Sequence, residues 1–149
     1  MDPATVRCHV DWQNRPLYLI TDGYSLRSSG LLVAAVLAAL EGARGAVSCL
    51  QLREHGLENG ASDSELLRLL SELKPICEEH DVKLILNRRI DLALRASVDG
   101  VHCGEDSMRL CELRSQLGSQ LLLGYSAHSI AEAQTALRDG ASYVLLSPI

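Results

Sequence analysis

The sequence lacks an apolar run long enough to cross a bilayer, and it lacks an excess of basic charge. Its longest apolar run, Leu31 to Leu40, is shorter than the about 20 residues that a membrane-spanning helix needs. It also lies too far from the first residue, without a charged flank, to be a signal peptide. The formal net charge is -5 with both signs interspersed, so no field attracts nucleic acid or an anionic membrane surface. We expect a cytoplasmic protein with neither kind of partner.

Paired cysteines and Cys/His clusters are missing as well. The five cysteines are an odd number without a Cys-x-x-Cys motif, and several lie in apolar runs where a thiol packs as a small hydrophobe. This pattern argues against a disulfide framework and against a zinc site. What is present is 149 residues, 47% hydrophobic and 22% charged, which is ordinary for one globular domain with its own core.

From residue 17 onward the sequence alternates between two hydrophobic periods. Short apolar, partly β-branched runs predict strands, and apolar stripes at helical spacing predict helices. Strands are expected at 17–21, 46–54, 82–87, 100–104, 120–128 and 142–149, and helices at 31–41, 62–79, 90–97, 107–117 and 129–138. Residues 1–16 show neither period, so we expect an N-terminal leader there, laid over one end of the fold or disordered, and a domain at 17–149.

Strict alternation of strands and helices predicts an α/β fold with a parallel sheet and the helices outside it. Three helix exits also resemble one another, at Gly45, Gly100 and Gly140, as the repeat of a (β/α) barrel would. Such a barrel typically has eight units in about 250 residues. The sequence therefore leaves two architectures open: a doubly wound open sheet, or a (β/α)8 barrel of the TIM type that is truncated after its sixth strand.

Polar residues stand where the expected strands end. In parallel α/β folds, reactive groups gather at the carboxyl ends of the strands. The residues there are Thr21, Asp22, Gln51, Arg53, Asn87, Arg88, His102, Asp106, Ser126, His128 and Ser147. Because strand side chains alternate between faces, Gln51 and Arg53 should share one face, and Ser126 and His128 should share the face of Gly124. Their convergence predicts a binding site at this end of the sheet.

Four stretches resemble blocks of one known family, in the same order and at similar spacing. They are LYLITDG, CLQLREHG, LILNRRIDLALRASVDGVHCGED and GYSAHSIAEAQTALRDGASYVLLSPI. Together they resemble the thiamine phosphate synthase and TenI superfamily over about residues 17–149. The resemblance implies a barrel of eight units that stops here as its sixth strand finishes, before the segments that supply the phosphate-binding loops and a lysine. The exposed edge strands left by such a truncation would also permit a homo-oligomer.

The resemblance also implies roles for individual residues. Gln51 and Arg53 match residues near the pyrimidine and its diphosphate, and Asn87 matches the asparagine that reads the pyrimidine. Arg88 stands where synthases carry an aspartate that binds magnesium. A guanidinium has no lone pair for a metal, so this exchange argues against a magnesium site. Asp106 would be the second metal carboxylate, in a segment one residue shorter than usual.

Ser126 and His128 match the serine and the histidine that follow the fifth strand in this superfamily. Tautomerases use that histidine as a base, and its pKa suits proton transfer. We therefore expect a TenI-like protein acting on a thiazole phosphate by a metal-free proton shift, with no cofactor. One alternative is a thiamine phosphate synthase, which condenses hydroxymethylpyrimidine diphosphate with thiazole phosphate and uses Mg2+. Another is a non-catalytic, regulatory or incomplete family member.

Overall fold

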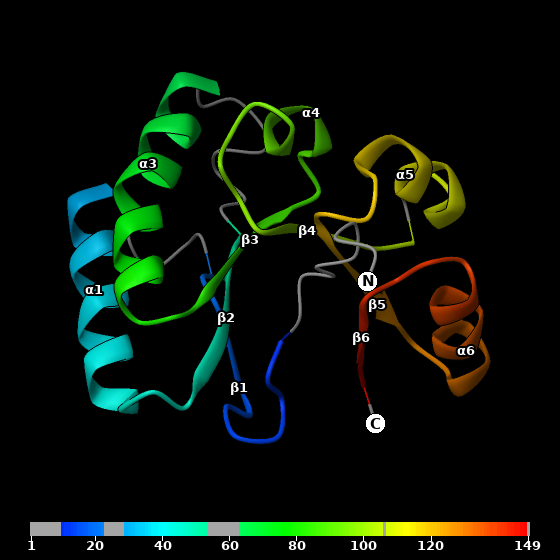
Figure 1. Cartoon of the computed structure of the whole chain (residues 1–149), viewed down its shortest axis with the longest axis horizontal. Coiled ribbons are helices and arrows are strands. Elements are labelled where there is room, and N and C mark those ends of the chain that lie inside the picture. The colour runs from blue at the N-terminus through cyan, green and yellow to red at the C-terminus, as the bar shows by residue number, and fades with distance from the viewer. Residues whose placement is uncertain (1–9, 23–28, 54–62, 106, 149) are drawn as a thin grey trace, which may run out of the picture.

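The structure, a computed structural model, describes residues 10–22, 29–53, 63–105 and 107–148. Strands and helices alternate in it as the sequence predicts (Figure 1). The strands are β1 (Leu17–Ile20), β2 (Val47–Leu52), β3 (Lys83–Asn87), β4 (Gly100–Cys103), β5 (Leu122–Ala127) and β6 (Tyr143–Leu146). The helices are α1 (Ser29–Ala43), α3 (Asp63–Glu79), α4 (Ile90–Ala93), α5 (Leu110–Leu117) and α6 (Ile130–Arg138).

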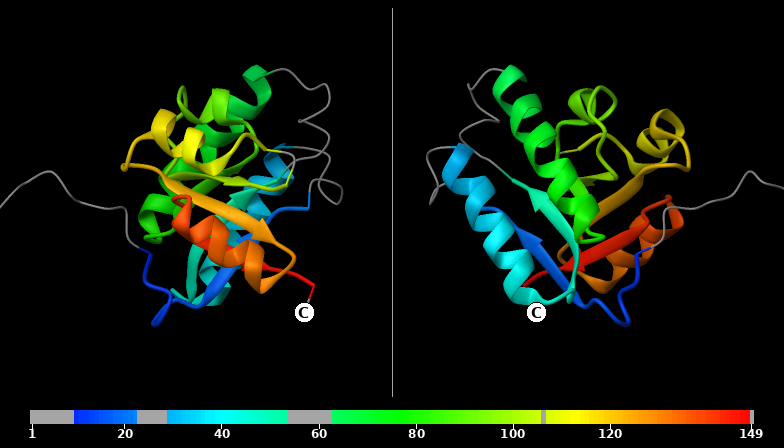
Figure 2. Two further views of the ribbon diagram at one scale, coloured as in Figure 1. Left: turned by 90° about the vertical axis from the view of Figure 1, so that its right-hand side faces the viewer. Right: turned by 60° about the vertical axis from the view of Figure 1, so that its left-hand side comes forward.

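The strands form one parallel sheet in the order β1-β2-β3-β4-β5-β6. A doubly wound sheet reverses its strand order at a switch point, and this sheet has no such reversal. The sheet curls so that its two edge strands face each other, and the hydroxyl oxygens of Tyr18 on β1 and Tyr143 on β6 lie 2.7 Å apart (Figure 2). The fold is a parallel α/β half-barrel of the TIM type, which confirms the second architecture.

The main core lies between the outer face of the sheet and the helices that cover it. Leu50 on β2 and Leu84 on β3 are fully buried there against Leu73 of α3. The alternate strand residues point inward, where Cys49 and Ile85 belong to a second, smaller cluster. The predicted alternation of faces is thereby confirmed, and it delivers every second side chain of each strand to the barrel interior.

Two helices are shorter than the sequence predicts. α4 ends at Ala93 rather than near Ser97. Beyond it the chain continues in a turn in which the Arg95 and Ala96 N–H groups both donate to the carbonyl oxygen of Leu92, so the regular ladder of one bond per carbonyl is lost. α5 begins at Leu110 rather than at 107, because Arg109 is extended, with φ -55° and ψ 134°. The expected start of the second helix at residue 62 lies outside the described residues.

The segment before β1 lies against the end of the barrel opposite the carboxyl ends of the strands. Val10 is buried in the inner cluster, and the Trp12 ring lies 5.6 Å from the Tyr143 ring. The Arg15 guanidinium donates to the carbonyl oxygens of Gly45 and His80, which lie in the turns before β2 and β3. The boundary at residue 16 stays a prediction. No helix among the described residues is long and apolar enough to span a membrane.

Candidate functional site

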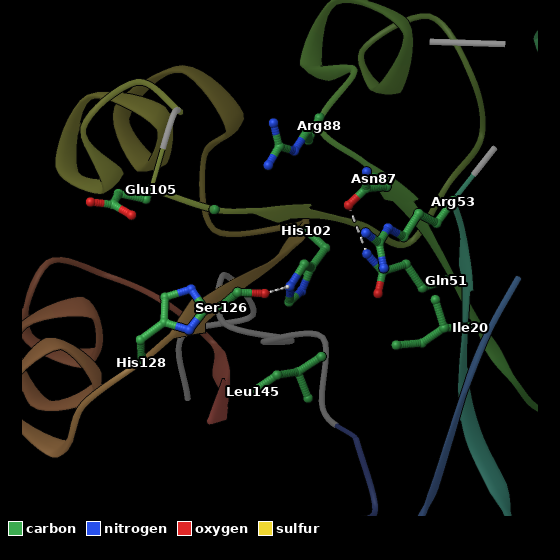
Figure 3. A pocket seen from close by; sticks show the side chains of 11 residues that line it. Ile20, Gln51, Arg53, Asn87, Arg88, His102, Glu105, Ser126, His128 and Leu145 are labelled. Atoms are coloured by element: carbon green, nitrogen blue, oxygen red, sulfur yellow. Dashed lines mark hydrogen bonds between the residues drawn. The ribbon is translucent and has the colours of Figure 1, made fainter. Parts of the chain in front are cut away.

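A cavity of about 320 Å³ opens at the carboxyl end of the sheet (Figure 3). All six strands contribute a side chain or a residue just beyond their end, as expected for the mouth of a parallel barrel. The lining residues are Ile20, Gln51, Arg53, Asn87, Arg88, His102, Gly104, Glu105, Ser126, His128 and Leu145. The cavity has two parts, a buried and neutral floor and an exposed and charged rim.

The floor contains a pair of amide side chains from neighbouring strands. Gln51 and Asn87 are only 2% and 6% exposed, and Gln51 Nε2 donates to Asn87 Oδ1 over 2.8 Å. The two strands pair in register, with Gln51 opposite Ile85, so the amides meet diagonally across β2 and β3. Their hydrogen bond fixes which end of each amide donates and which accepts. A pair fixed in this way can recognise a ring that carries both donors and acceptors.

His102 on β4 completes the floor. Its ring is 3% exposed, and its Nε2 lies 2.8 Å from the hydroxyl oxygen of Ser126 on β5. Burial lowers the pKa of His102 to about 4, with the charges of Arg53 and Arg88 adding to the effect. The imidazole is therefore neutral at physiological pH, and it is a hydrogen-bonding group rather than a cation.

The rim carries two guanidinium groups. Arg53 follows β2, and its backbone N–H donates to the buried hydroxyl of Thr21 over 2.8 Å. Arg88 follows β3 with φ +61°, a left-handed conformation that is uncommon for a residue with a side chain. Its backbone N–H donates to the carbonyl oxygen of His102 over 2.9 Å, and its guanidinium lies over Gly104. Two such groups at one mouth can hold an anion with several oxygens.

His128 lies on the rim at the end of β5. Its Nδ1 donates to the carbonyl oxygen of Ser147, and its backbone N–H donates to the Glu132 carboxylate over 2.8 Å. Ser129 caps α6 by accepting from the Glu132 N–H, as expected for a serine at that position. Because a carbonyl oxygen can only accept, Nδ1 carries a hydrogen, and Nε2 is the nitrogen through which this ring could exchange a proton.

The structure brings together six of the seven residues that the sequence singles out: Gln51, Arg53, Asn87, Arg88, Ser126 and His128. Their individual roles stay predictions. Asp106, the seventh, lies outside the described residues. His102 is among the strand-end residues that the sequence places at this edge of the sheet, but the family resemblance assigned it no role. The alternation rule could have singled it out, since His102 shares the inward face of Gly100.

The described residues do not fit the magnesium site that the family resemblance would imply. Within the described ranges, no three His, Cys, Asp or Glu side chains lie close enough together to hold a metal ion. Among the described residues that line the cavity, Glu105 is the one acidic side chain, and it shares the rim with Arg53 and Arg88. Magnesium prefers several oxygen ligands in octahedral geometry, and guanidinium groups offer none.

Comparison with known proteins relates almost the whole chain to one family. Residues 17–149 match the model of a family described as thiamine monophosphate synthase. A thiamine-phosphate synthase from Clostridium acetobutylicum is 39% identical over 136 residues, which are 91% of this chain and 59% of that protein. A thiamine-phosphate synthase from Chloroflexus aurantiacus is 37% identical over 94% of this chain and 59% of its own length.

A solved structure of similar shape carries a related name. It is a thiamine phosphate pyrophosphorylase from Pyrococcus furiosus, with a TM-score of 0.76 and 28% sequence identity. The alignment covers 93% of this chain and 63% of that one. This chain thus spans about three fifths of the length of these three relatives.

Proposed function

The chain belongs to the thiamine monophosphate synthase family, and we propose that it takes part in the condensation of hydroxymethylpyrimidine diphosphate with thiazole phosphate. The relatives quoted above are named as synthases, and this favours the synthase alternative. They do not confirm the TenI-like tautomerase that the sequence led us to expect. Because the chain spans part of those relatives, we assign to it the part of the site that its six strands build.

One observation carries the proposal: a fixed pair of amides and two guanidinium groups face the same cavity. An aminopyrimidine ring carries donors and acceptors that Gln51 and Asn87 are able to match. Its diphosphate carries oxygens that Arg53 and Arg88 are able to pair with, since a guanidinium binds phosphate through charge-assisted hydrogen bonds. The buried floor thus suits the ring, and the exposed rim suits the anion.

The chemistry of the condensation explains why cations belong on the rim. The carbon–oxygen bond between the pyrimidine methylene and the diphosphate breaks, and pyrophosphate leaves with the electron pair. The thiazole nitrogen forms the new bond to that carbon, giving thiamine phosphate. Negative charge grows on the leaving oxygen as its bond breaks, so a guanidinium next to the diphosphate lowers the barrier. We assign this role to Arg88, with Arg53 as its neighbour.

Inorganic pyrophosphate is a direct probe of this proposal. We expect calorimetry to detect its binding to the protein in the presence of EDTA. Arg88→Gln should weaken that binding about 10- to 100-fold, the range for losing a hydrogen bond between charged groups. Arg138→Gln is the matched control, because Arg138 ends α6 at the opposite end of the barrel and makes the same change in net charge. An unchanged affinity in Arg88→Gln would contradict the assignment.

A turnover assay separates the synthase from the alternatives. With both substrates present, the protein should release pyrophosphate and form thiamine phosphate, and Arg88→Gln should slow this release at least as much as it weakens binding. Binding of pyrophosphate without any condensation would leave a binding role and defeat the synthase proposal. Interconversion of thiazole carboxylate isomers that is lost in His128→Ala would instead establish the tautomerase.

A further inference from the structure

A chain of four hydrogen-bonding side chains runs from the barrel interior to the cavity. The Tyr18 and Tyr143 hydroxyl oxygens lie 2.7 Å apart, and the Tyr143 hydroxyl lies 3.3 Å from His102 Nδ1. On the other side of the ring, His102 Nε2 lies 2.8 Å from the Ser126 hydroxyl oxygen (Figure 3). Ser126 lines the cavity, whereas Tyr18 and Tyr143 do not. The two tyrosines therefore contact the cavity only through His102.

The packing around this chain of bonds is close. The ring centres of Tyr18 and Tyr143 lie 5.6 Å apart, and those of His102 and Tyr143 lie 5.8 Å apart. Gly124 on β5 provides the space in which they meet. A Cβ atom there would lie 2.5 Å from His102 Nδ1 and closer still to the Tyr143 ring and hydroxyl. Glycine at this position is what allows Tyr143 to approach the imidazole.

The bonds can run continuously in two directions, because a neutral imidazole has one donor nitrogen and one acceptor nitrogen and thereby couples the bonds on its two sides. In the first, Tyr18 donates to Tyr143, Tyr143 donates to His102 Nδ1, and His102 Nε2–H donates to Ser126. In the second, every bond is reversed, so Ser126 donates to Nε2 and Tyr143 donates to Tyr18. His102 is neutral for the reasons given above, and burial raises the pKa of the Tyr143 phenol, which therefore stays a donor.

Each direction uses three of the four donor hydrogens, and the two directions differ in which hydrogen is left over. The first leaves the Ser126 hydrogen, which lies at the cavity, whereas the second leaves the Tyr18 hydrogen without an acceptor among the described residues. Tyr18 packs against the inner cluster, whose members are Val10, Cys49, Ile85, Leu122 and Tyr143 and which is therefore mostly apolar. A donor left unpaired in such surroundings is unfavourable, so the first direction prevails.

We propose that His102 is a positioning residue. The hydrogen bond from Tyr143 to Nδ1 keeps the imidazole proton on Nε2, and the bond from Nε2–H to the Ser126 oxygen makes the Ser126 hydroxyl a donor aimed at the cavity. With its oxygen already accepting from Nε2–H, Ser126 has its own hydrogen left for a ligand. His102 then has no vacant nitrogen to receive the Ser126 proton. Ser126 and His102 lie within hydrogen-bond distance, as a nucleophile and its general base would. Here, however, the imidazole donates to the hydroxyl instead of accepting its proton. The cavity ligand must present an acceptor to Ser126, such as a phosphate oxygen or a ring nitrogen.

The tautomer of His102 can be measured without any ligand. In protein labelled with 15N in its histidine rings, two-bond 1H–15N spectra distinguish Nε2–H from Nδ1–H, and the His102 signals are assigned by their loss in His102→Gln. We expect the Nε2–H tautomer at neutral pH. Tyr143→Phe should introduce a population of the Nδ1–H form, whereas Tyr125→Phe, the same change on the outer face of β5, should not. An Nδ1–H tautomer in the unaltered protein would overturn the proposal, whatever the variants do.

The consequence for the ligand rests on the proposed function, and pyrophosphate affinity tests it. We expect Ser126→Ala, which removes a hydrogen bond to the anion, to weaken pyrophosphate binding about 10-fold, and Tyr143→Phe, which only frees that bond to reorient, about 3-fold. Because Tyr143 acts through Ser126, Tyr143→Phe should have no further effect in the Ser126→Ala background. Equal losses in both backgrounds would show a merely structural role and refute the positioning. A protein that shows the Nε2–H tautomer but does not bind pyrophosphate would refute the proposed function and leave the tautomer assignment standing.

Discussion

Lowering the pH from 7 to 4 should destabilise this protein through one buried imidazole, that of His102. In the unfolded chain this ring titrates near 6.5, whereas in the folded protein its pKa is lowered to about 4. Above pH 6.5 both states hold a neutral ring, and the stability is fully present. Between pH 6.5 and 4 the unfolded chain binds a proton that the folded protein does not, so the free energy of unfolding falls as the pH falls.

The size of the effect follows from the difference between the two pKa values. A gap of about 2.5 pH units, at about 1.4 kcal/mol per unit, gives a loss of roughly 3 kcal/mol by pH 4. Roughly 1 kcal/mol of it should be lost by pH 5.5, before most carboxylates titrate. A domain of this size has about 10 kcal/mol of stability in all, so the loss is readily measured.

Urea unfolding at pH 7, 5.5 and 4 gives the free energies, with His102→Gln as the reference. Carboxylates and the other histidines titrate in both proteins, so the difference between them isolates His102. The advantage of the unaltered protein over the variant should shrink by roughly 3 kcal/mol between pH 7 and 4. If the two proteins lose stability in parallel, the ring is not held neutral by the fold, and the reasoning fails. Arg88→Gln should raise the His102 pKa only part of the way back towards 6.5, because burial is the larger cause of its lowering.

Two further predictions concern the scaffold. Leu73→Ala should lower the free energy of unfolding by about 2–5 kcal/mol, because the Leu73 side chain is 0% exposed in the main core. Leu94→Ala is the control and should change that free energy little, because Leu94 is 58% exposed. Denaturant midpoints check both, and a small loss for Leu73→Ala would contradict the assigned core. Arg114→Ala should lower the melting temperature by several degrees, because the Arg114 guanidinium donates to three backbone carbonyl oxygens. These acceptors belong to Gly118, Leu121 and Gly140. Arg138→Ala is the control, and equal shifts in the two variants would contradict this role of Arg114.

The sequence was sufficient to predict the strands and the faces they present. Alternation places Gln51 and Ser126 inward in any parallel strand, because the pleat depends on nothing outside the strand. It was not sufficient to predict helix ends. α5 begins at Leu110 because Arg109 is extended, and nothing in the spacing of apolar residues reports that backbone conformation.

The role of His102 was beyond sequence reasoning for a different reason. The alternation of faces along β4 shows that His102 points inward, but the tyrosines that meet beside it come from both edges of the sheet. Tyr18 and Tyr143 are 125 residues apart in sequence, and they meet only because the sheet curls. A histidine at a strand end is compatible with many roles, and the tautomer that defines this one depends on that meeting.

The charged rim and the neutral floor of the cavity support each other. The guanidinium groups of Arg53 and Arg88 disfavour a second positive charge on His102, adding to the effect of burial. A carboxylate in place of Arg88 would favour the protonated ring instead, and an imidazolium donates from both nitrogens. Tyr143 could then no longer donate to Nδ1, and its hydrogen bond would have to reverse. The arginine at position 88 thus does more than offer a guanidinium to an anion: it favours the neutral ring whose single proton makes Ser126 a donor. In the proposed function the same guanidinium groups bind the anion, so anion binding and the single direction of the hydrogen bonds through His102 depend on the same residues.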